Sequence, residues 1–260
     1  MPAFAKKAAP LRLPLVMSTT TVQETAPDVQ PAPVSARRSV SAHALFWFTV
    51  VLLLGVDLWS KAWVFANLGA REVRTMIPGM LEFRRSLNDG AVFGSFSGRV
   101  GVFIIASVFA LLFVMYLFMH SHAKQRVLHV CLAMILAGAL GNLYDRAFMI
   151  ADVVQFSDGR MRLIGKVVGD DGGPTVQVGD WPDGGSPDTV LRSKVEIHQQ
   201  GVVRDFLKFV PKFPKSFGRL GGVDMWPWVF NIADAALVMG VILLILTSIF
   251  ERAPRHQTQT

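Results

Sequence analysis

Two acidic residues in the C-terminal quarter of the chain have the type and setting that acid–base chemistry requires. Asp234 lies in "FNIADAAL" (230–237), at the start of a run that is apolar enough to cross a bilayer, and Asp205 lies in "GVVRDFL" (201–207). An ionised carboxyl at mid-membrane depth costs roughly 2.5–3.5 kcal/mol. Asn231 precedes Asp234 by three residues, so both side chains share one helix face and the amide can orient the carboxyl.

Two carboxyl groups that meet in a low-dielectric pocket cannot both ionise easily, and they tend to hold one proton between them. That is the protonation state of an aspartyl protease, in which the charged partner takes a proton from water and the neutral partner protonates the substrate carbonyl. Such a pair titrates as a unit. Spacing alone does not show that Asp205 and Asp234 meet.

The composition predicts an integral membrane protein. Of the 260 residues, 52% are hydrophobic and 17% are charged, which is too apolar for an ordinary soluble domain of this length. Four stretches reach or approach the ~20 apolar residues that a spanning helix needs, namely 44–68, 100–119, 127–144 and 228–250. The predicted fold class is mainly α: a polytopic four-helix membrane bundle with a small extracytoplasmic β sheet and an inserted β-rich segment.

The net charge of +7 favours topology signals and contact with anionic membrane lipids, not nucleic-acid binding. Basic residues lie in the leader, in the acid-free connection "HSHAKQR" (120–126) and in the C-terminal tail. Under the positive-inside rule both termini are therefore expected in the cytoplasm. The other two connections are also basic, so the bias is partial.

Five segments are expected along the chain. Residues 1–42 are predicted to be a disordered cytoplasmic tail, because "LRLPLVM" is too short and too interrupted for a signal peptide. Residues 43–146 are expected to form three membrane helices with a first extracytoplasmic β-rich loop. Turn signals such as "GDDGGP" (169–174) between β-branched pieces predict a β-rich extracytoplasmic insert over 147–200. A catalytic segment with a fourth membrane helix (201–250) and a cytoplasmic tail (251–260) follow.

Other chemistries find little support. "RDFLKFVPKFPKSFGRL" (204–220) carries two prolines and is read as a broken basic-aromatic segment at the membrane interface. Cys131 is the only cysteine and is expected to serve packing. His120, His122 and His129 are not expected to form a zinc site, because no acid lies nearby to complete it. We therefore expect no metal and no other cofactor.

Five blocks in order resemble the bacterial lipoprotein signal peptidase (signal peptidase II) family. They are "GVDLWSKAW" (55–63), "SLNDGAVFGSF" (86–96), "LAGALGNLYDR" (136–146), "GVVRDFL" (201–207) and "FNIADAAL" (230–237). The resemblance covers about 43–250 without the insert. It implies a four-span aspartyl endopeptidase of the cytoplasmic (inner) membrane, acting on its outer side. Such an enzyme removes signal peptides from diacylglyceryl-modified prolipoproteins just before the lipidated cysteine.

The resemblance also assigns roles to residues of this chain. Asp205 and Asp234 match the catalytic aspartates. Supporting roles fall on Asp57 and Asp145, and the four-residue spacing from Asp57 permits an ion pair with Lys61. Asn88, Asn142, Arg146 and Asn231 match residues that line the site and bind substrate. The expected partners are prolipoprotein substrates and membrane lipids, with no nucleic acid, and a monomer is expected.

Two departures from the family pattern stand beside the site. The insert separates Arg146 from Asp205 by 59 positions, where the family has a short turn. Arg204 replaces a valine directly before Asp205 and is expected to point outward, because an inward guanidinium would depress the pKa of an aspartate. The alternative function is a small transporter or channel component whose membrane acids relay protons or ions.

Overall fold

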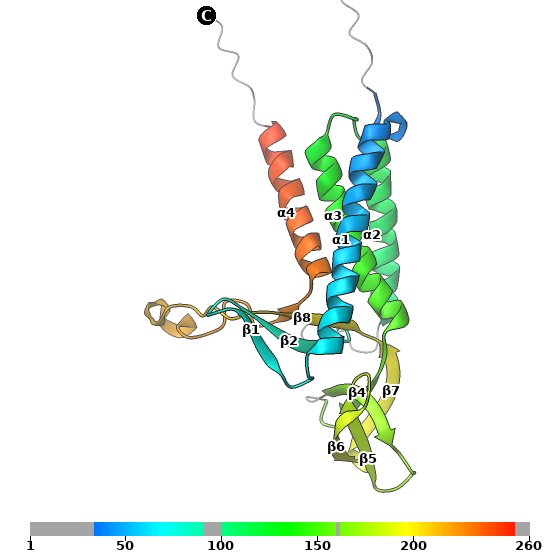
Figure 1. Cartoon of the computed structure of the whole chain (residues 1–260), viewed down its shortest axis with the longest axis vertical. Helices are drawn as coiled ribbons and strands as arrows, with labels where there is room; N and C mark the ends of the chain where they lie inside the picture. The colour runs from blue at the N-terminus through cyan, green and yellow to red at the C-terminus, as the bar shows by residue number, and fades with distance from the viewer. Residues whose placement is uncertain (1–33, 91–99, 160–161, 253–260) are drawn as a thin grey trace, which may run out of the picture. The chain divides into compact units, whose positions relative to one another are not determined.

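Four long helices and two antiparallel sheets make up the described chain (Figure 1). The computed structural model describes residues 34–90, 100–159 and 162–252. The helices are α1 (Val40–Asn67), α2 (Val100–His120), α3 (Arg126–Phe148) and α4 (Ile232–Arg252). Short 3-10 turns occupy η1 (Ala36–Arg38), η3 (Arg192–Lys194) and η4 (Lys215–Leu220).

Three of the described helices are long and apolar enough to cross a membrane: Val40–Asn67, Arg126–Phe148 and Ile232–Phe250. In α2, the stretch Ile104–His120 is apolar but shorter. The first helix begins four residues before the predicted start, and Ala36 and Ala42 are buried. Residues 34–42 therefore have a fixed structure, and the rest of the predicted N-terminal tail lies outside the described residues.

Helix α3 lies between the others and contacts α1, α2 and α4. Small residues make this possible, as in other membrane helix interfaces. A Cβ on Gly141 would overlap Oδ2 of Asp57 and press on the side chain of Ala233, so only glycine permits the observed approach. A core cluster that includes the stacked rings of Phe46 and Phe118 fills the part of the bundle away from the sheets.

The first sheet joins two distant parts of the sequence. Its strands are β1 (Val73–Ile77), β2 (Leu81–Asn88), β8 (Val203–Phe209) and β9 (Val229–Phe230), in the order β1-β2-β8-β9. Ser86 pairs with Asp205 across β2 and β8, and Asn88 pairs with Val203. The register therefore brings the end of β2 beside Asp205.

Strand β8 overturns part of the sequence interpretation. Residues 204–209 were expected in an irregular segment at the membrane interface, but they form a strand in which Phe206 and Lys208 are buried. Phe206 packs with Val64 and Leu68 of the α1 end. Lys208 donates to the Asp224 carboxylate at 2.9 Å and to the Trp226 carbonyl at 2.8 Å. Only Lys215–Leu220 retains the short helical turn of a broken segment.

The second sheet consists of residues from the predicted insert. Its strands are β3 (Ile150–Phe156), β4 (Arg162–Gly169), β5 (Thr175–Asp180), β6 (Gly185–Leu191) and β7 (Val195–Gly201), in the order β6-β5-β4-β3-β7. Valines fill its core, with Val154, Val176 and Val178 buried.

The two ends of the insert lie next to each other. Ile150 pairs with Gly201 at the base of the β3–β7 ladder, and the Val202 amide donates to the Met149 carbonyl at 2.9 Å. A Cβ on Gly201 would overlap the carbonyl of Arg146, so glycine allows this close backbone contact. The end of α3 therefore lies directly beside the start of β8, although 59 positions separate Arg146 from Asp205 in sequence.

Candidate active site

Asp234 is fixed by a reciprocal cap at the start of α4. Its backbone amide donates to Asn231 Oδ1 at 2.9 Å, and its Oδ2 accepts from the Asn231 backbone amide at 3.3 Å. This is the pattern of a capping box, which satisfies two of the amides that a helix start leaves unpaired. A carboxylate in the first turn also interacts favourably with the positive end of the helix dipole. The acid that looks costly in an apolar run therefore lies at a favourable position.

Asp205 is more deeply buried than Asp234. It lies on β8, outside the helices, and only 2% of its surface is exposed. Asn88 Nδ2 donates to Oδ2 at 3.1 Å, and Asn231 Nδ2 donates to Oδ1 at 2.6 Å. Burial, with a further contribution from the nearby Asp234 carboxyl, raises the pKa of Asp205 to about 7, although both amide bonds act to lower it.

Both carboxyl groups line one cavity of about 540 Å³. Its walls come from the end of β2, from β8 and from the segment leading into α4, and they include Ser86, Asn88, Asp89, Trp226, Trp228 and Phe230. The cavity is large enough for several water molecules or an extended peptide segment. The two acids that sequence spacing could not connect therefore share one space.

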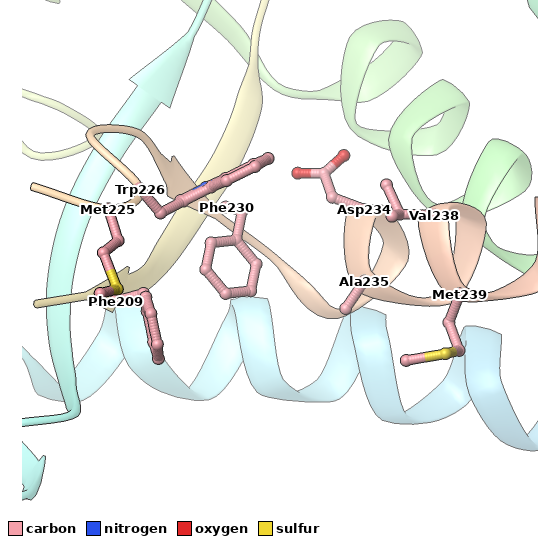
Figure 2. Close-up of a pocket in the computed structure, with 8 residues that line it drawn as sticks. All are labelled: Phe209, Met225, Trp226, Phe230, Asp234, Ala235, Val238 and Met239. Carbon is pink, nitrogen blue, oxygen red and sulfur yellow. The ribbon is translucent and has the colours of Figure 1, made fainter. Parts of the chain in front are cut away.

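An almost wholly apolar pocket of about 360 Å³ lies next to this cavity and shares Trp226, Phe230, Asp234 and Val238 with it. Figure 2 shows the Asp234 carboxyl as the single charged group among its eight labelled lining residues. Phe209, Met225 and Met239 complete the apolar wall. The same carboxyl thus faces both a polar and an apolar space.

Asn142 connects the carboxyl groups to a buried ion network. Its Nδ2 donates to Asp234 Oδ1 at 2.7 Å, while its Oδ1 accepts from Asn231 at 3.1 Å and from Lys61 Nζ at 3.2 Å. Lys61 also pairs with Asp57 at 2.8 Å and with Asp145 at 3.4 Å. The ion pair expected from the spacing of Asp57 and Lys61 is therefore present, and Asp57 reaches further, accepting from the Ala233 amide at 2.8 Å.

Arg204 does not point at the candidate dyad, but it does not face solvent either. Arg204 is buried, and its guanidinium donates to Asp145 Oδ1 at 2.7 Å. Its backbone amide donates to Asp145 Oδ2 at 2.9 Å. Successive side chains of a strand point to opposite faces, so Arg204 faces α3 and leaves Asp205 to face the cavity. Truncating one member of such a buried pair leaves an uncompensated charge, which makes the pair a strong determinant of local geometry.

The residues expected to bind substrate fall into two groups. Asn88 lines the cavity. Asn142 and Asn231 are buried and hold the two carboxyl groups. Arg146 is half-buried, and its positive charge lies within electrostatic range of both Asp205 and Asp234. Residues 91–96 of the second motif lie outside the described residues.

Several site residues were not found by sequence reasoning. Trp226, Trp228 and Phe230 line the cavity, and Asp89 is buried beside it. The aromatic triplet around Trp228 is a signal that could have indicated a lining, because aromatic side chains commonly line ligand sites. Within the described residues, no group of three or more His, Cys, Asp or Glu side chains is arranged to hold a metal ion.

Comparison with known proteins places this geometry in a family. The model of the signal peptidase (SPase) II family matches residues 49–250. The lipoprotein signal peptidase of Desulfitobacterium hafniense (strain DSM 10664 / DCB-2) is 26% identical over 215 residues, covering 83% of this chain and 99% of that protein. The lipoprotein signal peptidase of Rhodopirellula baltica (strain DSM 10527 / NCIMB 13988 / SH1) is 28% identical over 234 residues, covering 87% of this chain and 82% of that protein.

Solved structures support the same fold. A bacterial membrane enzyme determined at 2.3 Å resolution by the in meso method aligns with a TM-score of 0.52 and 19% identity, covering 83% of this chain and 93% of that one. A second bacterial membrane enzyme, at 1.9 Å, aligns with a TM-score of 0.50 and 20% identity, covering 78% of this chain and 92% of that one. With the family match extending across most of its length, this chain is a multi-pass membrane protein that belongs to the signal peptidase II family of proteases.

Proposed function

We propose that the chain is an aspartyl endopeptidase in which Asp205 and Asp234 form the catalytic pair. The observation that carries the proposal is that these two carboxyl groups line one cavity and are bridged by one residue, Asn231, which donates to Asp205 from its side chain and to Asp234 from its backbone amide. An asparagine that donates to both carboxyl groups fixes their relative orientation. Catalytic groups need such fixed geometry before substrate binds.

The raised pKa of Asp205, about 7, supports a pair that holds one proton near neutral pH. In the proposed reaction the charged carboxyl takes a proton from a water molecule, whose oxygen adds to the scissile carbonyl carbon. The neutral carboxyl gives its proton to the carbonyl oxygen. When the tetrahedral intermediate breaks down, the protonated carboxyl gives its proton to the leaving nitrogen, the other carboxylate takes a proton from a hydroxyl of the intermediate, and the C–N bond breaks, so the pair again holds one proton.

The proposed substrates are diacylglyceryl-modified prolipoproteins, cut just before the lipidated cysteine. The relatives named lipoprotein signal peptidases support this substrate class. The apolar pocket shared with the Asp234 cavity supports an apolar group close to the cleaved bond. Asn88 and Arg146 are proposed to contact the substrate. Asn142 and Asn231 are proposed to orient the carboxyl groups, together with the Asn88 amide, which donates to Asp205. Lys61, with Asp57 and Asp145, supports that arrangement.

The proposed setting is the bacterial cytoplasmic (inner) membrane. In this arrangement α1 to α4 form a four-span bundle, both termini lie in the cytoplasm, and both sheets and the cavity lie on the outer side. The acid-free basic connection between α2 and α3 supports this orientation. The protein is proposed to act as a monomer, with the 147–200 insert as an extracytoplasmic segment. A transporter or channel role is not favoured, because the relatives are peptidases.

The test uses full-length protein reconstituted in lipid with two forms of one prolipoprotein reporter, diacylglyceryl-modified and unmodified. We expect wild-type protein to cleave the modified form alone. Asp205→Asn and Asp234→Asn should each abolish cleavage while the thermal unfolding midpoint shows folded protein. Asp188→Asn is the matched control, because Asp188 is 60% exposed and pairs with Arg71 on the surface. Cleavage by either dyad variant would exclude that residue from the pair, and turnover of the unmodified reporter would exclude the proposed substrate class.

A further inference from the structure

The insert holds the second strand of the first sheet at two points. Arg162, the first residue of β4, pairs through Nη1 with Asp89 Oδ2 at 2.5 Å. Arg85 of β2 donates through Nη2 to the carbonyl of Trp181, which follows β5. Trp181 is in turn fixed to the base of the insert, because its Nε1 donates to the Ile150 carbonyl at 2.8 Å. These two attachments lie four residues apart on the chain and enclose the part of β2 that faces Asp205.

The Arg162 attachment acts on a turn that aims one side chain at the candidate dyad. Asn88 Oδ1 accepts from the Gly90 amide at 2.9 Å, which closes a turn around Asp89. With its oxygen engaged there, the Asn88 amide directs Nδ2 to Asp205 Oδ2 at 3.1 Å. A contact chain thus runs from the insert through Asp89 and Asn88 to Asp205.

We propose that Arg162 of the insert is a positioning residue for the peptidase reaction, acting through Asp89 to hold the Asn88 amide on Asp205. The inference rests on the proposed function and concerns the same site. It gives the insert a role in catalysis that the five family motifs do not contain.

Burial distinguishes this ion pair from the other insert contacts. The side chains of Arg162 and Asp89 are 17% and 7% exposed. The surface pair of Arg71 and Asp188, which also connects the insert to the rest of the chain, is 67% and 60% exposed. Exposed pairs are screened by water and hold geometry weakly, whereas taking a charged partner from a buried carboxylate costs more and favours a shift of that carboxylate. Loss of Arg162 would therefore displace the turn that contains Asp89.

A displaced turn should change the pH dependence of kcat, which general destabilisation of the protein does not do. The hydrogen bond from Asn88 acts to lower the pKa of Asp205, so its loss would raise that pKa and move the alkaline limb of the kcat profile to higher pH. The other groups that face Asp205 remain in place in an Arg162 variant: Asp234 from α4, Lys61 from α1, Arg146 from α3 and the Asn231 amide.

The experiment compares full-length Arg162→Gln, Arg162→Lys and Asn88→Ala with wild type on the lipidated reporter. Arg192→Gln is the matched control. Arg192 is likewise an arginine of the insert that pairs with an aspartate, but its partner is Asp170 and the pair lies on the surface. We expect Arg162→Gln to lower kcat by about tenfold with little change in KM, since small misplacements of catalytic groups cost up to a hundredfold. Its alkaline limb should move in the same direction as that of Asn88→Ala. Arg162→Lys should restore most of the activity, and Arg192→Gln should match wild type.

The outcomes separate this inference from the proposed function. If wild-type protein does not cleave the lipidated reporter, the proposed function fails, and this inference fails with it. If wild type is active and Arg162→Gln has the same kcat and pH profile, Arg162 is not a positioning residue and the function stands. A loss in Arg162→Gln without movement of the alkaline limb would also overturn the inference. Thermal unfolding midpoints identify any variant that is merely misfolded, and Arg162→Lys then gives the decisive comparison.

Discussion

Asn231 and Asp234 cap each other's backbone amides at the start of α4, and the remaining amide nitrogen of Asn231 reaches Asp205 at 2.6 Å. One residue therefore begins the helix, sets the first-turn carboxyl and contacts the second carboxyl. The start of the helix and the geometry of the candidate dyad therefore both depend on three atoms of Asn231: its backbone nitrogen, Oδ1 and Nδ2.

Replacing Asn231 should separate its two roles. Serine and asparagine are comparable N-caps, whereas alanine costs about 0.5–2 kcal/mol at this position. We expect Asn231→Ser to unfold close to the wild-type midpoint and Asn231→Ala to unfold earlier. Both should lose most cleavage activity, because alanine has no donor and the shorter serine side chain does not reach from the cap to Asp205. An active Asn231→Ser variant would contradict a bridging role for the amide.

The pH dependence follows from the raised pKa of Asp205. Because burial raises the pKa of Asp205 to about 7, the candidate pair retains a proton below this pH and loses it above. We therefore expect kcat to fall as the pH rises through about 7. The folded protein also binds this proton more tightly than the unfolded chain, so the associated stability is lost as the pH rises through the same value. A kcat profile that stays level from pH 6 to 9 would contradict the shared-proton pair.

Two helix glycines provide a matched pair for testing how closely the helices approach. A Cβ on Gly141 would overlap Asp57 Oδ2, whereas Gly55 has nothing within 4 Å of a Cβ. Glycine costs about 0.5–1 kcal/mol relative to alanine inside a helix, so Gly55→Ala should be neutral or stabilising. We expect Gly141→Ala to lower the thermal midpoint and to reduce cleavage, because it pushes Asp57 away from the Ala233 amide. Equal midpoints for the two variants would contradict this account.

Removing the outer part of the insert should leave a folded protein with reduced activity. Val153 pairs with His198 across β3 and β7, so residues 154–197 can be replaced by an Asn-Gly turn, which suits a two-residue hairpin. The contacts between Met149 and Val202 and between Asp145 and Arg204 remain. We expect kcat to fall by about tenfold, as for Arg162→Gln.

The excised variant also has informative alternatives. Wild-type kcat would show that the insert is peripheral to catalysis. Complete loss of cleavage in a correctly inserted protein would show that the insert builds part of the cavity itself.

Local spacing predicted the contacts that lie within one helix turn. The four-residue interval between Asp57 and Lys61 indicated their ion pair. The three-residue interval between Asn231 and Asp234 indicated an interaction, but Asn231 lies before the helix and caps it instead of sharing its face. Apolar run length indicated the helices, with α3 ending at Phe148, four residues beyond the predicted end of that span. These features depend on residues that are neighbours in sequence, so a single sequence contains them.

Strand β8 could not be predicted in the same way. Arg204, Asp205 and Lys208 are charged and belong to a segment that was expected to lie at the membrane interface, yet all three are buried. Their partners come from α3, from β2 and from the loop before β9, and no local pattern reports them. The burial of Arg204 against Asp145 was not predicted for this reason, and neither was the Arg162–Asp89 pair.

The closed base of the insert has a consequence for how this enzyme family can diversify. The insert begins at Ile150 and ends at Gly201, and these two residues pair side by side. Segments of different length can therefore be inserted there without changing the distance between the end of α3 and strand β8. Residues of such an inserted segment can then change the surroundings of the candidate site, while the spacing of the catalytic residues stays the same.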